Sequence, residues 1–117
     1  MNLDEALSKD EELKTKFQNA VTAKAPLDAV IIGKTDRCVL GNWLYGEGER
    51  KYQFLKGYKP CVEAHAAFHL QAGKVVRQIN GGEYEDAQAM IADGSAYSKA
   101  FVALDAAVKQ LKKDAKL

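Results

Sequence analysis

Long apolar runs and an excess of either charge are both missing from this chain. Lys and Arg together number 17 and Asp and Glu 16, for a formal net charge of +1. That balance does not indicate binding to nucleic acid or to an anionic membrane surface. The longest strongly apolar run, residues 29–32, is far too short to cross a bilayer, and residues 1–20 lack the apolar stretch of a signal peptide. We therefore expect a cytoplasmic protein with neither a nucleic-acid nor a membrane partner.

Cysteine, proline and histidine are equally scarce, with two of each. In a reducing compartment, Cys38 and Cys61 are expected to be thiols or metal ligands rather than a structural disulfide. No segment shows the alternation typical of a strand, and there is no repeat or low-complexity stretch. Apolar residues make up 47% of 117 residues, which suits one core, so we expect residues 1–117 to form a single domain.

The spacing of apolar residues is helical throughout and predicts three long helices and one short helix. The expected helices cover residues 3–24, 36–45, 58–80 and 83–113. The last is interrupted near residues 93–95, residues 25–35 form a connection, and residues 49–55 fit a further helical turn. The short helix would be capped by Thr35 or Asp36. The expected fold is all-α, an antiparallel four-helix bundle with a short second helix.

Two histidines lie on the apolar face of the helix expected over residues 58–80. His65 and His69 are four residues apart, so their imidazoles project from the same face. A single histidine on such a face is more often a hydrogen-bonded core residue than a ligand. Burying two requires partners for four ring nitrogens, and a metal ion would satisfy one from each. The pair alone leaves both interpretations open.

Asp10 is the only polar member of a series on the first expected helix that otherwise consists of Ala6, Leu13, Phe17 and Ala20. A carboxylate that points into a core is costly unless it is paired or binds a metal. Alternatively, the helix frays or rolls near residue 10 and leaves Asp10 in water.

The two cysteines have different surroundings. Cys38 lies early in the short helix beside Arg37, where its thiolate, the form that binds zinc, is favoured. A small buried apolar residue is the alternative. Cys61 lies one turn before His65 on the same face, and we favour packing over ligation. Trp43 is expected to anchor the core and Gly41 to permit close approach of helices.

Asp10, Cys38, His65 and His69 together would supply oxygen, sulfur and two nitrogen ligands from three helices. That ligand set suits a tetrahedral zinc site. The sequence therefore predicts one zinc ion as the cofactor.

Two motifs resemble those of the chemoreceptor zinc-binding (CZB) domain family of bacterial sensory proteins. Residues 38–43 match C-x-L-G-x-W, residues 65–69 match H-x-x-F-H, and residues 45–48 also fit. The similarity extends from the first helix to the start of the fourth. It implies a zinc site of three histidines and one cysteine, of which Cys38, His65 and His69 carry over. Asp10 stands where the family has its remaining histidine, so either it ligates the metal or water completes the site.

The resemblance also implies a function. Family members are cytoplasmic modules attached to chemoreceptors or diguanylate cyclases, and they sense zinc or oxidants such as hypochlorous acid through the zinc-bound cysteine. They commonly form homodimers. These 117 residues contain no output domain, so the chain would signal in trans as a freestanding member, or it is a fragment of a longer receptor.

We expect a regulatory module rather than an enzyme. The alternative is a metal-free helical dimerisation or protein-interaction domain, in which Asp10 marks decay of the site. Two histidines and a carboxylate also describe a non-haem iron triad, but the added thiolate and the lack of a spare catalytic base argue against a metalloenzyme.

Overall fold

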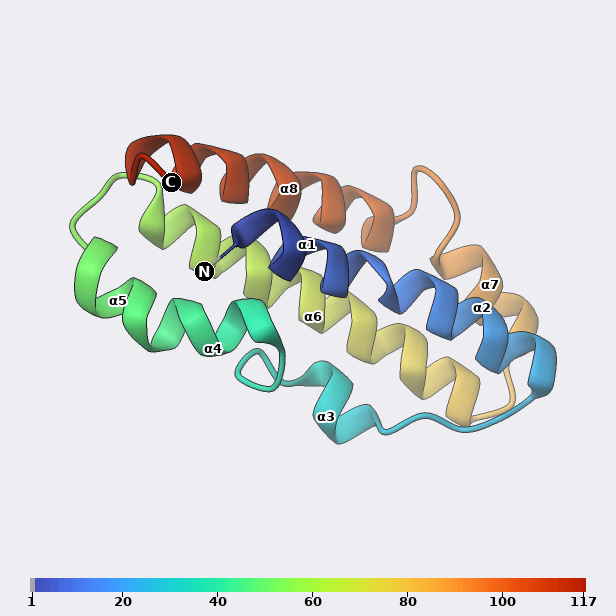
Figure 1. The fold of residues 1–117 in the computed structure, drawn as a ribbon. Helices are drawn as coiled ribbons and strands as arrows, with labels where there is room; N and C mark the ends of the chain where they lie inside the picture. The colour runs from blue at the N-terminus through green and yellow to red at the C-terminus, as the bar shows by residue number, and fades with distance from the viewer. Residues whose placement is uncertain (1) are drawn as a thin grey trace.

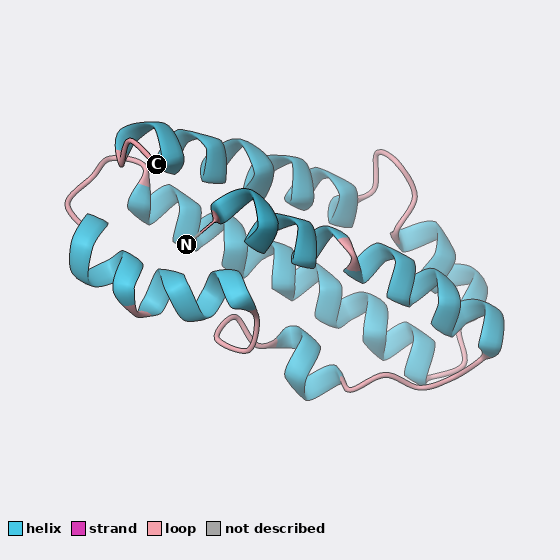
Figure 2. Ribbon diagram, viewed as in Figure 1, coloured by secondary structure: helices cyan, strands magenta, loops and turns pink. Residues whose placement is uncertain are grey.

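The computed structural model describes residues 2–117, and in this range it is helical without strands (Figures 1 and 2). The expected all-α class is therefore confirmed. The helical segments are α1 (Leu3–Glu11), α2 (Leu13–Ala23), α3 (Ala29–Gly33), α4 (Val39–Tyr45), α5 (Glu47–Tyr52), α6 (Tyr58–Asn80), α7 (Tyr84–Met90) and α8 (Ala96–Asp114). The antiparallel four-helix bundle is not confirmed, because the described range holds eight helical segments where four helices were expected.

The first expected helix is interrupted at one residue, Glu12. The Glu12 N–H donates to the Ser8 carbonyl and the Lys16 N–H donates to the Glu12 carbonyl, so the hydrogen-bonding pattern continues from α1 into α2. The Asn2 side chain caps α1 by accepting from the Glu5 N–H. Lys24 ends α2 in the left-handed conformation with φ 53°. The predicted span, residues 3–24, is therefore essentially correct.

The connection expected over residues 25–35 contains a helix that the sequence pattern did not reveal. The Asp28 side chain accepts hydrogen bonds from the Val30 and Ile31 N–H groups and starts α3. This short helix packs against α6, with Gly33 and Gly73 backbone to backbone at their contact. The apolar run at residues 29–32 is thus a helical turn.

The short helix begins later than expected. It starts at Val39, with Cys38 rather than Thr35 or Asp36 as the N-cap residue. The Cys38 backbone is extended, with φ −114° and ψ 165°, and its Sγ accepts from the Gly41 N–H. The cap position was wrong because sulfur takes a role that is usually filled by a hydroxyl or carboxylate oxygen. α5 then follows α4 directly after Gly46.

The 23-residue helix α6 lies at the centre of the molecule, as predicted over residues 58–80. It contacts α2, α3, α7 and α8. Its buried face includes both histidines and extends the length of the helix: Cys61, His65, Phe68, His69, Ala72, Gly73, Val75, Val76 and Ile79. The fourth expected helix is divided into α7 and α8, and the Ser95 side chain caps α8 by accepting from the Ser98 N–H.

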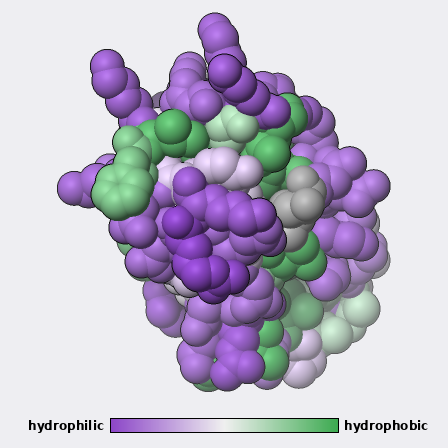
Figure 3. All heavy atoms as spheres, turned by 60° about the vertical axis from the view of Figure 1, so that its left-hand side comes forward, coloured by the Kyte–Doolittle hydropathy of each residue, from purple (hydrophilic) through white to green (hydrophobic). Residues whose placement is uncertain are grey.

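The other helical segments run alongside α6 (Figure 1): α1 continues into α2, α3 is followed by α4 and α5, and α7 is followed by α8. Figure 3, in which the left-hand side of Figure 1 comes forward, shows a mainly hydrophilic surface with smaller apolar patches. Among residues 2–117, no helix combines the length and the apolar character that crossing a membrane requires.

Candidate metal centre

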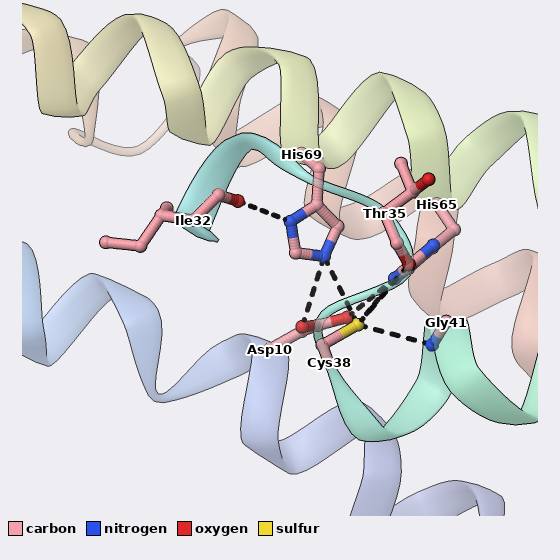
Figure 4. Close-up of polar contacts among 7 residues, drawn as sticks. All are labelled: Asp10, Ile32, Thr35, Cys38, Gly41, His65 and His69. Atoms are coloured by element: carbon pink, nitrogen blue, oxygen red, sulfur yellow. Dashed lines mark hydrogen bonds and ion pairs between the residues drawn. The ribbon is translucent and has the colours of Figure 1, made fainter. Parts of the chain in front are cut away.

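Four side chains from three parts of the chain converge at one point (Figure 4). Asp10 projects from α1, Cys38 from the N-cap of α4, and His65 and His69 from α6. One donor atom from each lies within 4.8 Å of all the others. The structure therefore brings together all four residues that the sequence singled out.

The separations suit a small tetrahedral ion. Cys38 Sγ lies 3.1 Å from His65 Nε2 and 3.5 Å from His69 Nε2. The Asp10 carboxylate oxygens lie 3.4 Å from the same two nitrogens. Zinc bonds of about 2.0–2.3 Å place tetrahedral donors about 3.3–3.8 Å apart, so little movement would be needed to hold the ion.

Three of the four side chains are almost completely buried. Asp10 is 2% exposed, His65 0% and His69 2%, whereas Cys38 is partly exposed. The interpretation that leaves Asp10 in water is therefore wrong, because α1 directs it into the interior. Asp10 Oδ2 and His65 Nδ1 lack a hydrogen-bond partner among the described residues. Asp10 Oδ2 lies 3.4 Å from His65 Nε2 without forming a hydrogen bond, so a metal ion at the centre would satisfy this oxygen and these residues fit the group.

The backbone orients His69. Its Nδ1 lies 2.8 Å from the Ile32 carbonyl oxygen, at the end of α3. Because a carbonyl can only accept, Nδ1 carries a proton, so Nε2 is the nitrogen that would ligate a metal ion once it has lost its own proton. Sequence reasoning missed this contact. The one local sequence feature that pointed to α3, and so to this contact, was Asp28, a good N-cap residue before the apolar run.

Gly41 holds the thiol in place. Its N–H donates to Cys38 Sγ at 3.2 Å. A Cβ at this position would overlap the Thr35 carbonyl and come within 3.1 Å of the His65 ring. The expected role of Gly41 in close approach of helices holds for α4 and His65 of α6, but the tightest contact is with the Thr35 carbonyl, which lies before the helix. The amide contact to sulfur is an addition that only the structure reveals.

The charges in the cluster are strongly coupled. Burial would raise the pKa of Cys38, but the hydrogen bonds from His65 and His69 outweigh it and lower this pKa to about 7. Burial would also raise the pKa of Asp10, but the polar contacts and positive charge of both histidines outweigh burial and lower this pKa. For His69, burial is outweighed by contacts with Asp10 and Cys38, which raise its pKa to about 10. Without a metal, the cluster therefore favours an anionic carboxylate and thiolate beside protonated histidines, and a metal ion would supply that positive charge in place of the Nε2 protons.

Cys61 does not belong to this cluster. It is fully buried in the apolar core, and burial raises its pKa to about 11. The packing interpretation is confirmed. Trp43 is likewise a core residue, 6% exposed.

No curated protein and no solved structure matches the chain. The family model described as the chemoreceptor zinc-binding domain matches residues 11–76, which is more than half of the chain. The matched segment contains Cys38, His65 and His69 and begins directly after Asp10. The motifs, the donor geometry and this match agree that the chain belongs to the chemoreceptor zinc-binding domain family, whose cofactor is zinc.

Proposed function

We propose that this chain is a zinc-binding regulatory module in which Asp10, Cys38, His65 and His69 hold one zinc ion. The observation that carries the proposal is the convergence of four donors of suitable chemistry within 4.8 Å of one another. Oxygen, sulfur and two imidazole nitrogens form a full tetrahedral set that leaves no open position for a substrate. That closed set supports the proposed regulatory role over an enzymatic one.

The four residues connect parts of the fold that are otherwise separate. When bound, zinc supplies a divalent charge shared by one carboxylate, one thiolate and two neutral imidazoles. Asp10 then ties α1, and Cys38 ties the start of α4, to the histidines of α6. We propose that the helical segments act as an antiparallel four-helix bundle that this connection holds together. Loss of one ligand would free α4 to move.

Cys38 is the ligand best placed to respond to a signal, because it is the one that is not fully buried. Hypochlorous acid would transfer chlorine to the thiolate sulfur and release hydroxide, and water would then displace chloride to give a sulfenic acid. Loss of zinc would free the same residue. We propose that the module senses zinc or oxidants in this way. It would act in the cytoplasm, as a homodimer, in trans on a chemoreceptor or a diguanylate cyclase.

One observation favours a second candidate, a metal-free interaction domain. The Asp10 carboxylate already pairs with both histidines at 3.4 Å, and such a cluster of opposite charges can persist without an ion. In that case the site would be structural, and the helical surface would carry the function.

Metal analysis of the purified protein separates the two candidates. We expect one zinc per chain in the wild type and loss of most of it in Cys38→Ala. Cys61→Ala is the matched control, since it removes a thiol from the core without touching the cluster. A wild-type protein that binds no zinc when supplied with excess metal would contradict the proposal and favour the interaction domain.

A further inference from the structure

A pocket reaches the metal centre from one side. Its volume is about 250 Å³, and it lies between α1, α2, the end of α3 and the start of α4. Asp10, Cys38 and His69 form part of its lining, whereas His65 does not contribute and is 0% exposed. The centre is therefore closed on the α6 side around His65 and accessible through this pocket.

Positive charge dominates the rim of the pocket. Lys9, Lys16, Lys34 and Arg37 line it, against one exposed acid, Glu12. Within residues 2–117, none of these four basic side chains has a salt-bridge partner, although four other lysines do. Their charge is thus uncompensated and faces the pocket mouth.

The rest of the pocket strengthens this field. Apolar side chains of Ile31, Ile32 and Val39 form part of the wall. A cleft lined by one sign of charge with low-dielectric walls concentrates the field and attracts small ions of opposite sign. Anions of a size that fits about 250 Å³ would therefore be drawn toward the donors.

We propose that this pocket is the route by which small carboxylate-bearing chelators reach and exchange the zinc ion. The proposal rests on the proposed function, since it requires zinc at the centre. Asp10 is the ligand that such an anion would replace, because this residue lines the pocket and its carboxylate is the chemical equivalent of the incoming group. One carboxylate oxygen takes the place of another, so the charge around the metal stays the same. Cys38 and His69 remain bound during this first exchange.

The competing route is local opening of the fold. If α4 has to detach before zinc can leave, every chelator would meet the same slow step, whatever its charge. The charge dependence of zinc removal therefore distinguishes entry through the pocket from opening of the protein.

The test compares zinc removal by an anionic chelator, EDTA, with removal by a neutral one, phenanthroline, in rapid-mixing experiments. The test variant is Lys16→Glu with Lys34→Glu, since neither residue adjoins a ligand. The matched control, Lys99→Glu with Lys113→Glu, makes the same charge change on exposed positions of α8, away from the pocket. At low salt we expect the test variant to lose zinc to EDTA about tenfold more slowly than the wild type, in line with electrostatic steering. Its rate of zinc removal by phenanthroline, and both rates in the control variant, should stay within about twofold of the wild type.

Salt supplies a second readout that needs no variant. In the wild type, the rate of zinc removal by EDTA should fall as ionic strength rises, because salt screens the rim charges beyond about 10 Å. The rate of zinc removal by phenanthroline should not change. The pocket route would be overturned if EDTA removed zinc from the test and control variants at equal rates. It would also be overturned if the test variant slowed removal by EDTA and by phenanthroline equally. Failure of the wild type to bind zinc would instead contradict the proposed function.

Discussion

At position 10 the chain places a carboxylate where the family resemblance implies a histidine. Aspartate offers a harder donor than imidazole, and zinc is of borderline softness, so the exchange is expected to weaken the site without abolishing it. The structure supports ligation by this residue in two ways: Asp10 is 2% exposed, and its Oδ2 has no hydrogen-bond partner among the described residues.

Substitution of Asp10 tests that role. We expect Asp10→His to bind zinc more tightly than the wild type, because it restores the family's ligand. Asp10→Ala should bind about 10–100-fold more weakly, with water in the vacant position. Competition titrations with a zinc indicator measure both. Asp93→Ala, an exposed acid outside the site, should leave the affinity unchanged, and equal affinity for the wild type and Asp10→Ala would show that Asp10 is not a ligand.

The two cysteines should differ sharply in reactivity. In the metal-free protein, the pKa of Cys38 is about 7 and that of Cys61 about 11. Near neutral pH, the thiolate fractions therefore differ by about 10⁴-fold. We expect iodoacetamide to modify one thiol per chain quickly and the second only after unfolding, as followed by mass spectrometry.

Cys38→Ser identifies the reactive thiol, because this variant should lose the fast reaction altogether. Zinc should also slow the reaction in the wild type. Fast modification of Cys61 in the folded chain would contradict its place in the core.

At the scale of the element, the start of α4 depends on one glycine. Gly41 donates to Cys38 Sγ, and a methyl group here would overlap the Thr35 carbonyl oxygen. The backbone around residues 35–38 would have to move, and the thiol would move with it.

Gly41→Ala should therefore destabilise the fold by about 1–3 kcal/mol, the usual cost of overpacking, and weaken zinc binding. Gly73→Ala is the matched control in α6, where an added Cβ would meet Gly33 at 3.6 Å, an ordinary contact. That change should be neutral or stabilising by up to about 1 kcal/mol, because alanine favours a helix. Urea denaturation measures both, and equal effects of the two substitutions would contradict the proposed crowding at Gly41.

At the scale of the whole molecule, the site joins segments that are far apart in the sequence. α1 and α4 pack against each other less extensively than α6 and α8 do. A metal ion held by Asp10, Cys38 and the histidine pair would therefore strengthen a weakly packed part of the fold.

Zinc should raise the melting temperature of the wild type. Free zinc at a thousand times its dissociation constant stabilises the folded state by about 4 kcal/mol. Thermal unfolding followed by circular dichroism should show this shift, and EDTA should reverse it. Cys38→Ala should show a much smaller shift, and an equal shift in both proteins would place the stabilising zinc elsewhere.

The sequence by itself determined the features that depend on local periodicity. The spacing of apolar residues predicts the all-helical class and the span of α6, and the four-residue spacing of His65 and His69 places both on the buried face of that helix. Cys38 and Asp10 were identifiable as chemically unusual for their positions. These inferences hold because helix geometry relates residues three or four apart, whatever the rest of the chain does.

Only the tertiary structure decided how those residues meet. The burial of Asp10 depends on the packing of α1 over the cluster, and the place of Cys38 depends on a cap in which sulfur accepts from the Gly41 N–H. The contact between Ile32 and His69 joins residues 37 positions apart. The basic pocket likewise combines residues of α1, α2 and the segment from α3 to α4. Such arrangements arise from the packing of helices against one another, which the periodicity within a single helix does not specify.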